Sequence, residues 1–229
     1  MTMLGFSVLD WAALAWFVSC WIGYIRFADY TRWHQRSVSA QMDEYRCRWM
    51  RNMLRRELKV IDTGVQGNLL QGVAFFASTA IFVLGGLIAA LGAGDRAMDL
   101  LSDLPFAVHD TQAGWKVKIL LLVVIFVYAF FKFAWCYRLF NYCSILIGAA
   151  PLIDQPDPKA DAFAEGIARI HGLAARHFNG GLRAYSFALG ALGWFIHPLL
   201  FIVATAWVTG VLYRREFRSR SLRILRQIR

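Results

Sequence analysis

Charged residues are scarce in this chain. They make up 17% of its 229 residues, whereas about 25% is typical of soluble domains, and hydrophobic residues make up 58%. This imbalance excludes an ordinary soluble domain. The long apolar runs also lack the alternation of β-strands, and helices are then the only reasonable membrane-spanning structure. We therefore predict an all-α, polytopic membrane protein.

The sequence also lacks the motifs of common catalytic and cofactor sites. It contains no G-x-S-x-G, P-loop or dinucleotide fingerprint and no visible nucleophile–base pair. None of its four cysteines is spaced as C-x-x-C, so we expect free thiols. His171 and His177 are six residues apart, which is wrong for a metal site on one helix. We expect no enzymatic activity, no cofactor and no metal.

Four apolar runs are long enough to cross a bilayer core, which needs about 20 residues. The predicted spans cover residues 6–25, 69–93, 117–147 and 185–212. The first run has neither a basic n-region nor a small-residue cleavage site, so we interpret it as a retained span rather than a secretory signal. The sequence thus predicts one four-helix membrane domain over 1–212 and an Arg-rich amphipathic tail over 213–229.

The links between the predicted spans differ in charge. The long first link is basic, and its part from Val38 to Val60 has the periodicity of an amphipathic helix. The link over 94–115 is short and acidic. The third link begins with prolines and continues as a predicted interfacial helix, Ala160 to Phe178, ended by Asn179-Gly180-Gly181.

Basic charge gives the chain a formal net charge of +10, which favours anionic lipid over nucleic acid as its partner. Four spans place both termini on one side of the membrane. Nine basic residues in the first link put the termini outside by the positive-inside rule, but the seven arginines of the tail argue the reverse. Because the first helix usually dominates, we predict external termini and cytoplasmic first and third links.

One stretch near the end of the third span resembles the most recognisable part of a known family, domain-of-unknown-function family 599. The stretch reads Arg138-Leu139-Phe140-Asn141-Tyr142-Cys143-Ser144-Ile145-Leu146-Ile147 and is followed by Pro151. The order of parts is also similar, with a polar start of the second span near Asp62-Gln66-Asn68. The resemblance covers residues 5 to 212. It implies a four-helix fold and a membrane location, for which we expect the bacterial inner membrane, but no established activity.

Lys132 is a single lysine in the middle of the third apolar run. A cation at such a depth costs on the order of 3 kcal/mol, so its side chain should face the protein interior, water or a ligand. One interpretation is a buried lysine held by backbone carbonyls and tyrosines such as Tyr128, which lies on the same helix face. The other is an anion or proton site in a pore or cleft.

Other polar residues of the spans have two interpretations each. Arg138 can snorkel while Asn141 bonds a neighbouring helix, or the pair can bind a lipid phosphate or an anion at a pore mouth. His197 precedes Pro198, so it can satisfy a carbonyl freed by a kink or act as a haem ligand or proton relay. A bis-His haem needs a second mid-membrane histidine, and the sequence has none.

Two functional hypotheses follow. In the first, the protein is a structural or accessory membrane subunit that packs through rows of small residues, such as Ala15, Ser19 and Gly23. It would bind anionic lipid or a larger complex through Lys132, Arg138, Asn141, Arg214, Arg215 and Arg218. The alternative is a homo-oligomeric anion channel or transporter, with Gln71 and Ser78 at its mouth and Lys132 selecting anions.

Overall fold

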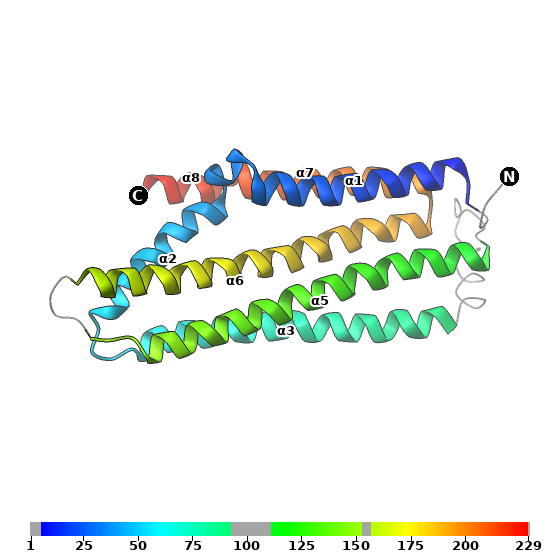
Figure 1. Cartoon of the computed structure of the whole chain (residues 1–229). Helices are drawn as coiled ribbons and strands as arrows, with labels where there is room; N and C mark the ends of the chain where they lie inside the picture. The colour runs from blue at the N-terminus through cyan, green and yellow to red at the C-terminus, as the bar shows by residue number, and fades with distance from the viewer. Residues whose placement is uncertain (1–5, 93–110, 153–156, 229) are drawn as a thin grey trace. The chain divides into compact units, whose positions relative to one another are not determined.

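The computed structural model describes residues 6–92, 111–152 and 157–228, and every regular element among them is a helix (Figure 1). This confirms the all-α prediction for the described part. In chain order the elements are α1 (Val8–Tyr30), η2 (Arg32–Arg36), α2 (Val38–Leu54), α3 (Val60–Gly92), α5 (Gln112–Gly148), α6 (Pro158–Ala191), η3 (Leu192–Phe195), α7 (Pro198–Phe217) and α8 (Arg220–Gln227). Most of the predicted acidic link lies outside the described residues.

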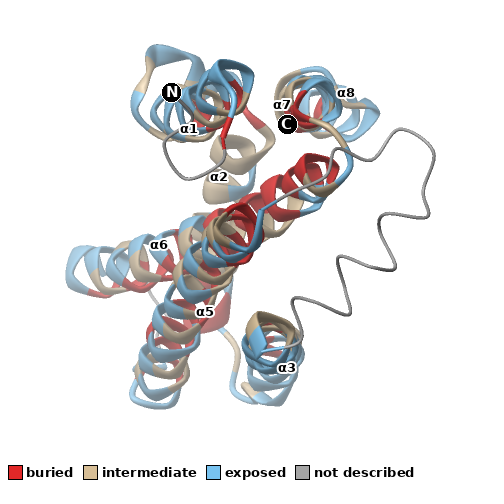
Figure 2. Cartoon of the chain, turned by 90° about the vertical axis from the view of Figure 1, so that its right-hand side faces the viewer, coloured by how far each residue is buried: buried red, intermediate tan, exposed pale blue. Residues whose placement is uncertain are grey.

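Three of these helices are long and apolar enough to cross a membrane, namely α1, α3 and α5. They correspond to the first three predicted spans and characterise the chain as a multi-pass membrane protein. The most apolar part of α3 is only 11% buried, and Phe75 and Phe82 on it are 66% and 79% exposed. Exposure along most of α3 is visible in Figure 2. Apolar side chains that cover one another so little are suited to contact with lipid chains.

The predicted fourth span, 185–212, is not one helix, and this expectation was wrong. Helix α6 continues to Ala191, the short η3 turn follows, and α7 begins at Pro198. Proline lacks a backbone N–H and is well suited to the first position of a helix, so it starts α7 instead of kinking a continuous span. A Cβ atom on Gly193 would lie 3.2 Å from backbone atoms of Leu200, so the turn brings the chain back closely on itself.

The predicted interfacial helix does not end at its glycines either. Helix α6 runs unbroken from Pro158 to Ala191 and therefore includes Asn179-Gly180-Gly181. A Cβ atom on Gly181 would lie 2.5 Å from Cε1 of Phe133 on α5, and one on Gly180 would lie 3.5 Å from Cδ of Lys132. These glycines are thus places of close helix approach, and tertiary packing outweighs their tendency to end a helix.

The chain divides into two compact units. Unit 1 comprises Met1–Thr31, Thr79–Ala129 and Leu182–Arg215, and unit 2 comprises Arg32–Ser78, Phe130–Gly181 and Glu216–Arg229. Helices α3, α5 and α6 contribute residues to both units.

Aromatic rings form the core of unit 1. Phe17 on α1 is fully buried, and its ring centroid lies 5.8 Å from that of Phe187 on α6 and 5.1 Å from that of Phe201 on α7. The Trp194 ring of η3 stacks on Phe201 at 5.1 Å. Helices α1 and α7 lie side by side in this unit, as Figure 1 shows. Such ring pairs add directional packing to apolar burial.

Unit 2 has a largely aliphatic core. Its buried cluster joins the last turns of α2 and α5 to the first half of α6, through Met50, Met53, Leu54, Cys143, Ile147, Ala150, Ala160, Ala164, Ile167 and Ala168. The small alanines on α6 let the helices approach closely. This packing holds the amphipathic helix α2 against the ends of α5 and α6.

Candidate functional site

The Arg-rich tail contains a short helix, α8, that docks inside unit 2. Ser219 caps this helix by accepting a hydrogen bond from the Leu222 N–H at 3.1 Å, and Leu222 is 2% exposed. Helix α8 packs on α2, where the Tyr45 hydroxyl donates to the Leu225 carbonyl at 3.5 Å. Arg226 donates from Nη2 to the Arg36 carbonyl of η2 at 3.1 Å. The tail is therefore anchored to the basic first link.

A second set of contacts fixes the start of the tail. The Glu216 carboxylate accepts hydrogen bonds from the backbone N–H of Ser39 at 3.2 Å and from its hydroxyl at 2.7 Å. Asn179 of α6 donates from Nδ2 to the hydroxyl oxygen of Ser39 at 3.2 Å. Glu216, the acidic residue of the tail, thus binds α2. Helix α8 itself contains arginines but no carboxylate.

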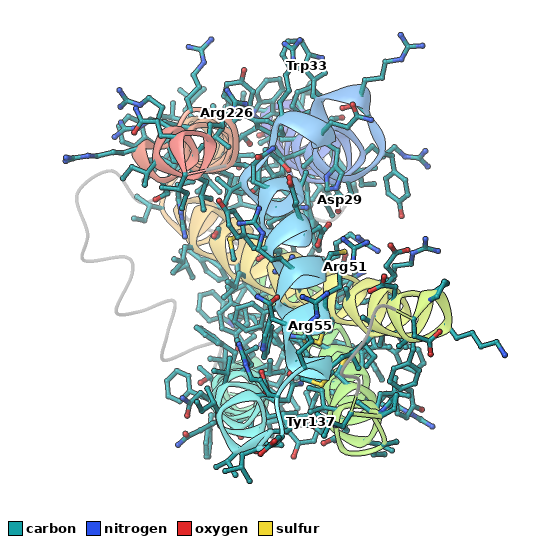
Figure 3. The ribbon with its side chains drawn as sticks, turned by 90° about the vertical axis from the view of Figure 1, so that its left-hand side faces the viewer. Asp29, Trp33, Arg51, Arg55, Tyr137 and Arg226 are labelled. Carbon is teal, nitrogen blue, oxygen red and sulfur yellow. The ribbon has the colours of Figure 1, made fainter. Side chains whose placement is uncertain are left out.

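The outer face of α8 combines positive charge with exposed apolar side chains. We define the α8 surface as Arg220, Arg223, Ile224 and Ile228, of which Ile224 and Ile228 are 48% and 60% exposed. The two arginines are exposed as well. The Arg36 guanidinium lies 5.1 Å from the Trp33 ring centroid, and Figure 3 shows the positions of Trp33 and Arg226. Basic residues interleaved with apolar ones are typical of a helix that lies on an anionic membrane surface.

The interior of unit 2 contains a cluster of buried polar side chains. Asp62, at the start of α3, is fully buried, and its Oδ1 accepts from Trp49 Nε1 at 2.6 Å and from Arg56. One turn later, Gln66 is 1% exposed and donates from Nε2 to the Phe140 carbonyl of α5 at 2.9 Å. This cluster connects α2, α3 and α5, and the polar start of the second span is thereby part of the core.

His171 of α6 completes this cluster. Its ring centroid lies 5.4 Å from the Trp49 ring and 4.8 Å from the Phe140 ring. Burial, together with the positive charge of Arg46, lowers the pKa of His171 to about 4, so the imidazole is neutral at pH 7. Neither ring nitrogen has a protein partner, and the same holds for Oδ2 of Asp62 and Oε1 of Gln66. Buried polar atoms of this kind are commonly hydrogen-bonded to ordered water.

A polar cavity of about 430 Å³ lies beside the same helix α2. It is lined by Glu44, Cys47, Arg48, Arg51, Asn52 and Arg55 of α2 and by Asp161 of α6. Arg51 pairs with Glu165 of α6 at 2.6 Å, and Arg51 and Arg55 are labelled in Figure 3. This cavity holds charges of both signs.

Two buried cations of unit 1, Arg183 and Lys118, were not among the predicted site residues. Arg183 of α6 is 6% exposed and donates to Asp29 Oδ1 at 2.8 Å, with its guanidinium 5.5 Å from the Tyr24 ring centroid. Lys118 of α5 is 2% exposed and donates to the Trp194 carbonyl at 2.8 Å. The signal that could have found the first pair is the position of Asp29 and Arg183, with opposite charges, just beyond the ends of two predicted spans.

The predicted residue Lys132 lies half-buried on α5 in unit 2. Its methylene carbons lie against Gly180 of α6. The lysine therefore faces α6.

Arg138 and Asn141 differ in their environments. Arg138 is exposed and donates from Nε to the Tyr142 hydroxyl at 2.6 Å, with its guanidinium 5.8 Å from the ring centroids of Trp135 and Tyr142. Asn141 is half-buried. The arginine is thus held on the surface of α5 by aromatic neighbours.

The remaining predicted residues are spread over several elements. Gln71 and Ser78 are exposed on α3 in unit 2. In unit 1, the Tyr128 ring lies edge-on to Trp21 at 5.5 Å. His197 accepts a hydrogen bond at Nδ1 from the Leu199 N–H at 3.1 Å, so it caps the start of α7 instead of satisfying a freed carbonyl.

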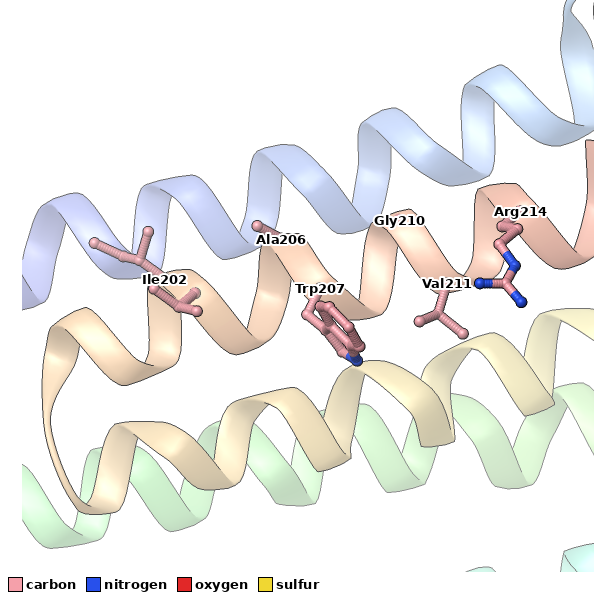
Figure 4. A pocket seen from close by; sticks show the side chains of 7 residues that line it. Ile202, Ala206, Trp207, Gly210, Val211 and Arg214 are labelled. Carbon is pink, nitrogen blue, oxygen red and sulfur yellow. The ribbon is translucent and has the colours of Figure 1, made fainter.

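Of the three tail arginines that the sequence singles out, Arg214 lies at a groove, while Arg215 and Arg218 are exposed. The groove has a volume of about 570 Å³ and follows α7 in unit 1 (Figure 4). It is lined by Ile202, Val203, Ala206, Trp207, Gly210, Val211 and Arg214. Six of these seven residues are apolar, and the guanidinium lies at the end of the row (Figure 4). An apolar groove that ends in a cation is complementary to an acyl chain with an anionic headgroup.

Metal-binding residues do not gather in the part of the chain that the structure describes: no three His, Cys, Asp or Glu side chains are close enough together to hold an ion.

These features define a class, a multi-pass helical membrane protein with an arginine-rich helix docked on its polar link. The chain belongs to the family described as Protein of unknown function, DUF599, whose model matches residues 12–221. This match confirms the resemblance seen in the sequence. Comparison with curated proteins and with solved structures finds no match.

Proposed function

We propose that this protein is a non-enzymatic accessory subunit of the bacterial inner membrane that binds anionic lipid through the α8 surface. The observation that carries this proposal is the docking of α8. Its Leu222 is buried against the protein, while Arg220, Arg223 and Ile224 remain exposed. Each basic residue near an anionic surface contributes about 1 kcal/mol, and exposed isoleucines add apolar contact.

The docking also bears on membrane orientation. If α1 crosses the membrane, the N-terminus and the first link lie on opposite sides of it. Because α8 packs on α2 of the first link, the tail lies on the side of that link. The nine basic residues of the link and the arginines of the tail then indicate the same orientation under the positive-inside rule. We propose that both lie in the cytoplasm and that the two termini lie on opposite sides.

This orientation needs an odd number of crossings. Helices α1, α3 and α5 supply three, and the pair α6 and α7, joined by the η3 turn, would cross twice more. Helix α6 has 34 residues and α7 has 20, which is enough length for both crossings at 1.5 Å per residue. Burial of the polar residues of α6, such as Arg183, among other helices would compensate for its lower hydropathy.

Packing with a second subunit is part of the proposal. A groove of about 460 Å³ between α1 and α7 in unit 1 is lined by Ser19, Cys20, Gly23, Tyr24, Phe27, Thr209, Gly210 and Tyr213. A Cβ atom on Gly23 or Gly210 would meet nothing within 4 Å. Small residues facing open space allow another helix to approach closely, which supports a homo-oligomer or a place in a larger membrane complex.

The lipid proposal is tested by removing charge from the α8 surface. We expect the double substitution Arg220→Gln, Arg223→Gln to reduce retention of phosphatidylglycerol several-fold, measured by native mass spectrometry of the purified full chain. The matched control removes two exposed cations from α6, Lys159→Gln with Arg169→Gln, and should retain lipid as the wild type does. Point substitution is preferable to truncation, because truncation would also remove the Glu216 contacts with Ser39. Equal retention in both variants would contradict the proposal.

Anion transport is a second candidate function, favoured by the half-buried position of Lys132 within an apolar helix. If Lys132 selects anions, Lys132→Met should change anion flux into reconstituted vesicles while the fold survives. The absence of flux in the wild type, or unchanged flux in the variant, would leave lipid binding as the remaining proposal.

A further inference from the structure

We propose that the polar cavity beside α2 binds a zwitterion that carries a phosphate and a primary ammonium group, as the headgroup of phosphatidylethanolamine does. This site is separate from the α8 surface, although both belong to unit 2.

The cavity beside α2 is lined by charges of both signs. Three arginines, Arg48, Arg51 and Arg55, share its wall with the carboxylates of Glu44 and Asp161. A purely anionic ligand would be attracted by the arginines but repelled by the carboxylates at comparable range. A ligand with both charges satisfies both sets, and therefore the lining favours a zwitterion over an anion.

Three of the charged side chains that line the cavity form no ion pair with one another. Arg51 is paired with Glu165, outside the cavity lining, at 2.6 Å. Within the described part of the chain, Arg48, Arg55 and Asp161 form no ion pair, although all three line one cavity of about 430 Å³. Two guanidinium groups are left to bind phosphate, a role for which their planar forks are well suited, and one carboxylate is left for an ammonium group.

The cavity lies near the ends of two candidate spans. Arg55 is the C-cap of α2, and the candidate span α3 begins five residues later at Val60. The other lining helix, α6, begins shortly after the candidate span α5 ends at Gly148. Lys59 donates to the Ala150 carbonyl and so ties the two span ends together. A cavity beside the ends of two spans is at the depth expected of lipid headgroups.

Chemistry alone does not separate a lipid headgroup from its soluble counterpart, so the test uses both. The full chain in detergent is titrated with glycerophosphoethanolamine and with glycerophosphoglycerol, which lacks the ammonium group, by isothermal titration calorimetry. Retention of phosphatidylethanolamine is measured in parallel by native mass spectrometry. We expect the wild type to bind the ethanolamine compound about tenfold more tightly than the glycerol compound, and the cavity to retain phosphatidylethanolamine beside any phosphatidylglycerol held by the α8 surface. Binding of the soluble compound identifies a headgroup site proper, whereas lipid retention alone identifies the lipid as the source.

Two variants separate the roles of the charges. Arg48→Gln with Arg55→Gln should weaken binding of both headgroups about tenfold or more. Asp161→Asn should remove the preference for the ethanolamine compound and leave binding of the glycerol compound unchanged or stronger. The control Arg169→Gln, 82% exposed and outside the cavity, should behave as the wild type. Thermal unfolding checks that each variant is folded.

The proposal is overturned by equal affinity for the two headgroups, by a preference that persists in Asp161→Asn, or by absence of binding to either compound and either lipid. These outcomes are independent of the α8 surface. If the cavity variants lose the ethanolamine preference but keep phosphatidylglycerol retention, this proposal stands beside the α8 proposal. If Arg220→Gln with Arg223→Gln changes nothing while the cavity variants do, the α8 proposal fails and this one stands.

Discussion

The two units treat buried polar groups differently. In unit 1 the buried cations have partners inside the unit: Arg183 pairs with Asp29, and Lys118 donates to the Trp194 carbonyl. The buried polar atoms without a partner among its described residues belong to the neutral side chains of Trp21 and Thr205. In unit 2, by contrast, His171, Asp62 and Gln66 all carry buried atoms without a protein partner.

The surfaces of the units differ in the same sense. Unit 1 exposes apolar side chains such as Trp207 on α7 and Ile88 on α3, at 74% and 64%. Unit 2 also exposes apolar side chains, such as Phe75 on α3, but it adds the exposed arginines of α2 and α8 and a cavity with charges of both signs. A region of paired internal charge and apolar surface suits the hydrocarbon of a bilayer, where an unpaired polar group is costly. A region with polar interior atoms and exposed arginines suits the hydrated headgroup layer.

Breaking the ion pair of unit 1 should have the largest effect. Arg183→Met leaves the Asp29 carboxylate, whose side chain is 22% exposed, without its partner. We expect a loss of stability of about 3 kcal/mol, because removal of one partner from a buried pair leaves an uncompensated charge. Thermal unfolding in detergent measures this loss, and Arg169→Met, at an exposed site, should cost less than about 0.5 kcal/mol.

The pair can also be replaced as a whole. The double variant Asp29→Leu, Arg183→Met should recover part of the stability lost in Arg183→Met, since neither charge then remains buried. Equal stability of Arg183→Met and the exposed control would show that unit 1 does not depend on paired internal charge.

The stability of unit 2 should depend on pH between 7 and 4. Burial lowers the pKa of His171 from 6.5 to about 4, so the unfolded chain takes up this proton more readily than the folded one. The stabilisation from His171 is therefore complete above pH 6.5 and is lost as the pH falls from 6.5 towards 4, by on the order of 3 kcal/mol. Unfolding followed between pH 7 and pH 4 measures it.

The matched variant for this prediction is His171→Phe, which removes the titrating ring and keeps an aromatic side chain between Trp49 and Phe140. Its stability should vary less over the same pH range. An identical pH profile in the wild type and in His171→Phe would mean that His171 is not held neutral by the core of unit 2.

A smaller effect is expected from the close approach of α5 and α6 in unit 2. Gly181→Ala places a methyl group against the buried ring of Phe133, and overpacking of this kind costs about 1–3 kcal/mol. Gly23→Ala in unit 1 is the control, because a Cβ atom there meets nothing within 4 Å. Thermal unfolding in detergent should show the loss only at position 181. If Phe133→Leu fails to relieve it, the cause is not this contact.

Hydropathy was sufficient to locate α1, α3 and α5, because these helices are apolar over a length that only a membrane span requires. It failed at α6, where the polar stretch around Asn179 and Arg183 looked like the end of an interfacial helix. In the folded chain these polar side chains bond Ser39 and Asp29, and the glycines between them receive α5. The two hydrogen bonds join residues 140 and 154 positions apart, and the glycine contacts join different helices, so no local pattern contains them.

The candidate site was predicted in part. The arginines of the tail are visible in the sequence, and so is their weak apolar stripe, Phe217, Ile224 and Ile228. The docking of α8 on α2 is not, since it depends on Leu222 and on single hydrogen bonds from Tyr45 and Arg226. Four predicted spans put the first link and the tail on opposite sides of the membrane, so their basic residues gave conflicting orientations. The fold brings these two segments together, because α8 packs on α2.

The most direct test of the account is the side of the membrane on which three positions lie. Single cysteines replace Val8 at the start of the first span, Gln35 in the first link and Ser221 in α8, all exposed, in a chain whose four native cysteines are changed to alanine. A membrane-impermeant maleimide is applied to intact cells and to inverted vesicles. We predict labelling of position 8 from outside the cell and labelling of positions 35 and 221 only from the cytoplasmic side. Labelling of positions 8 and 221 from the same side would contradict the proposed orientation.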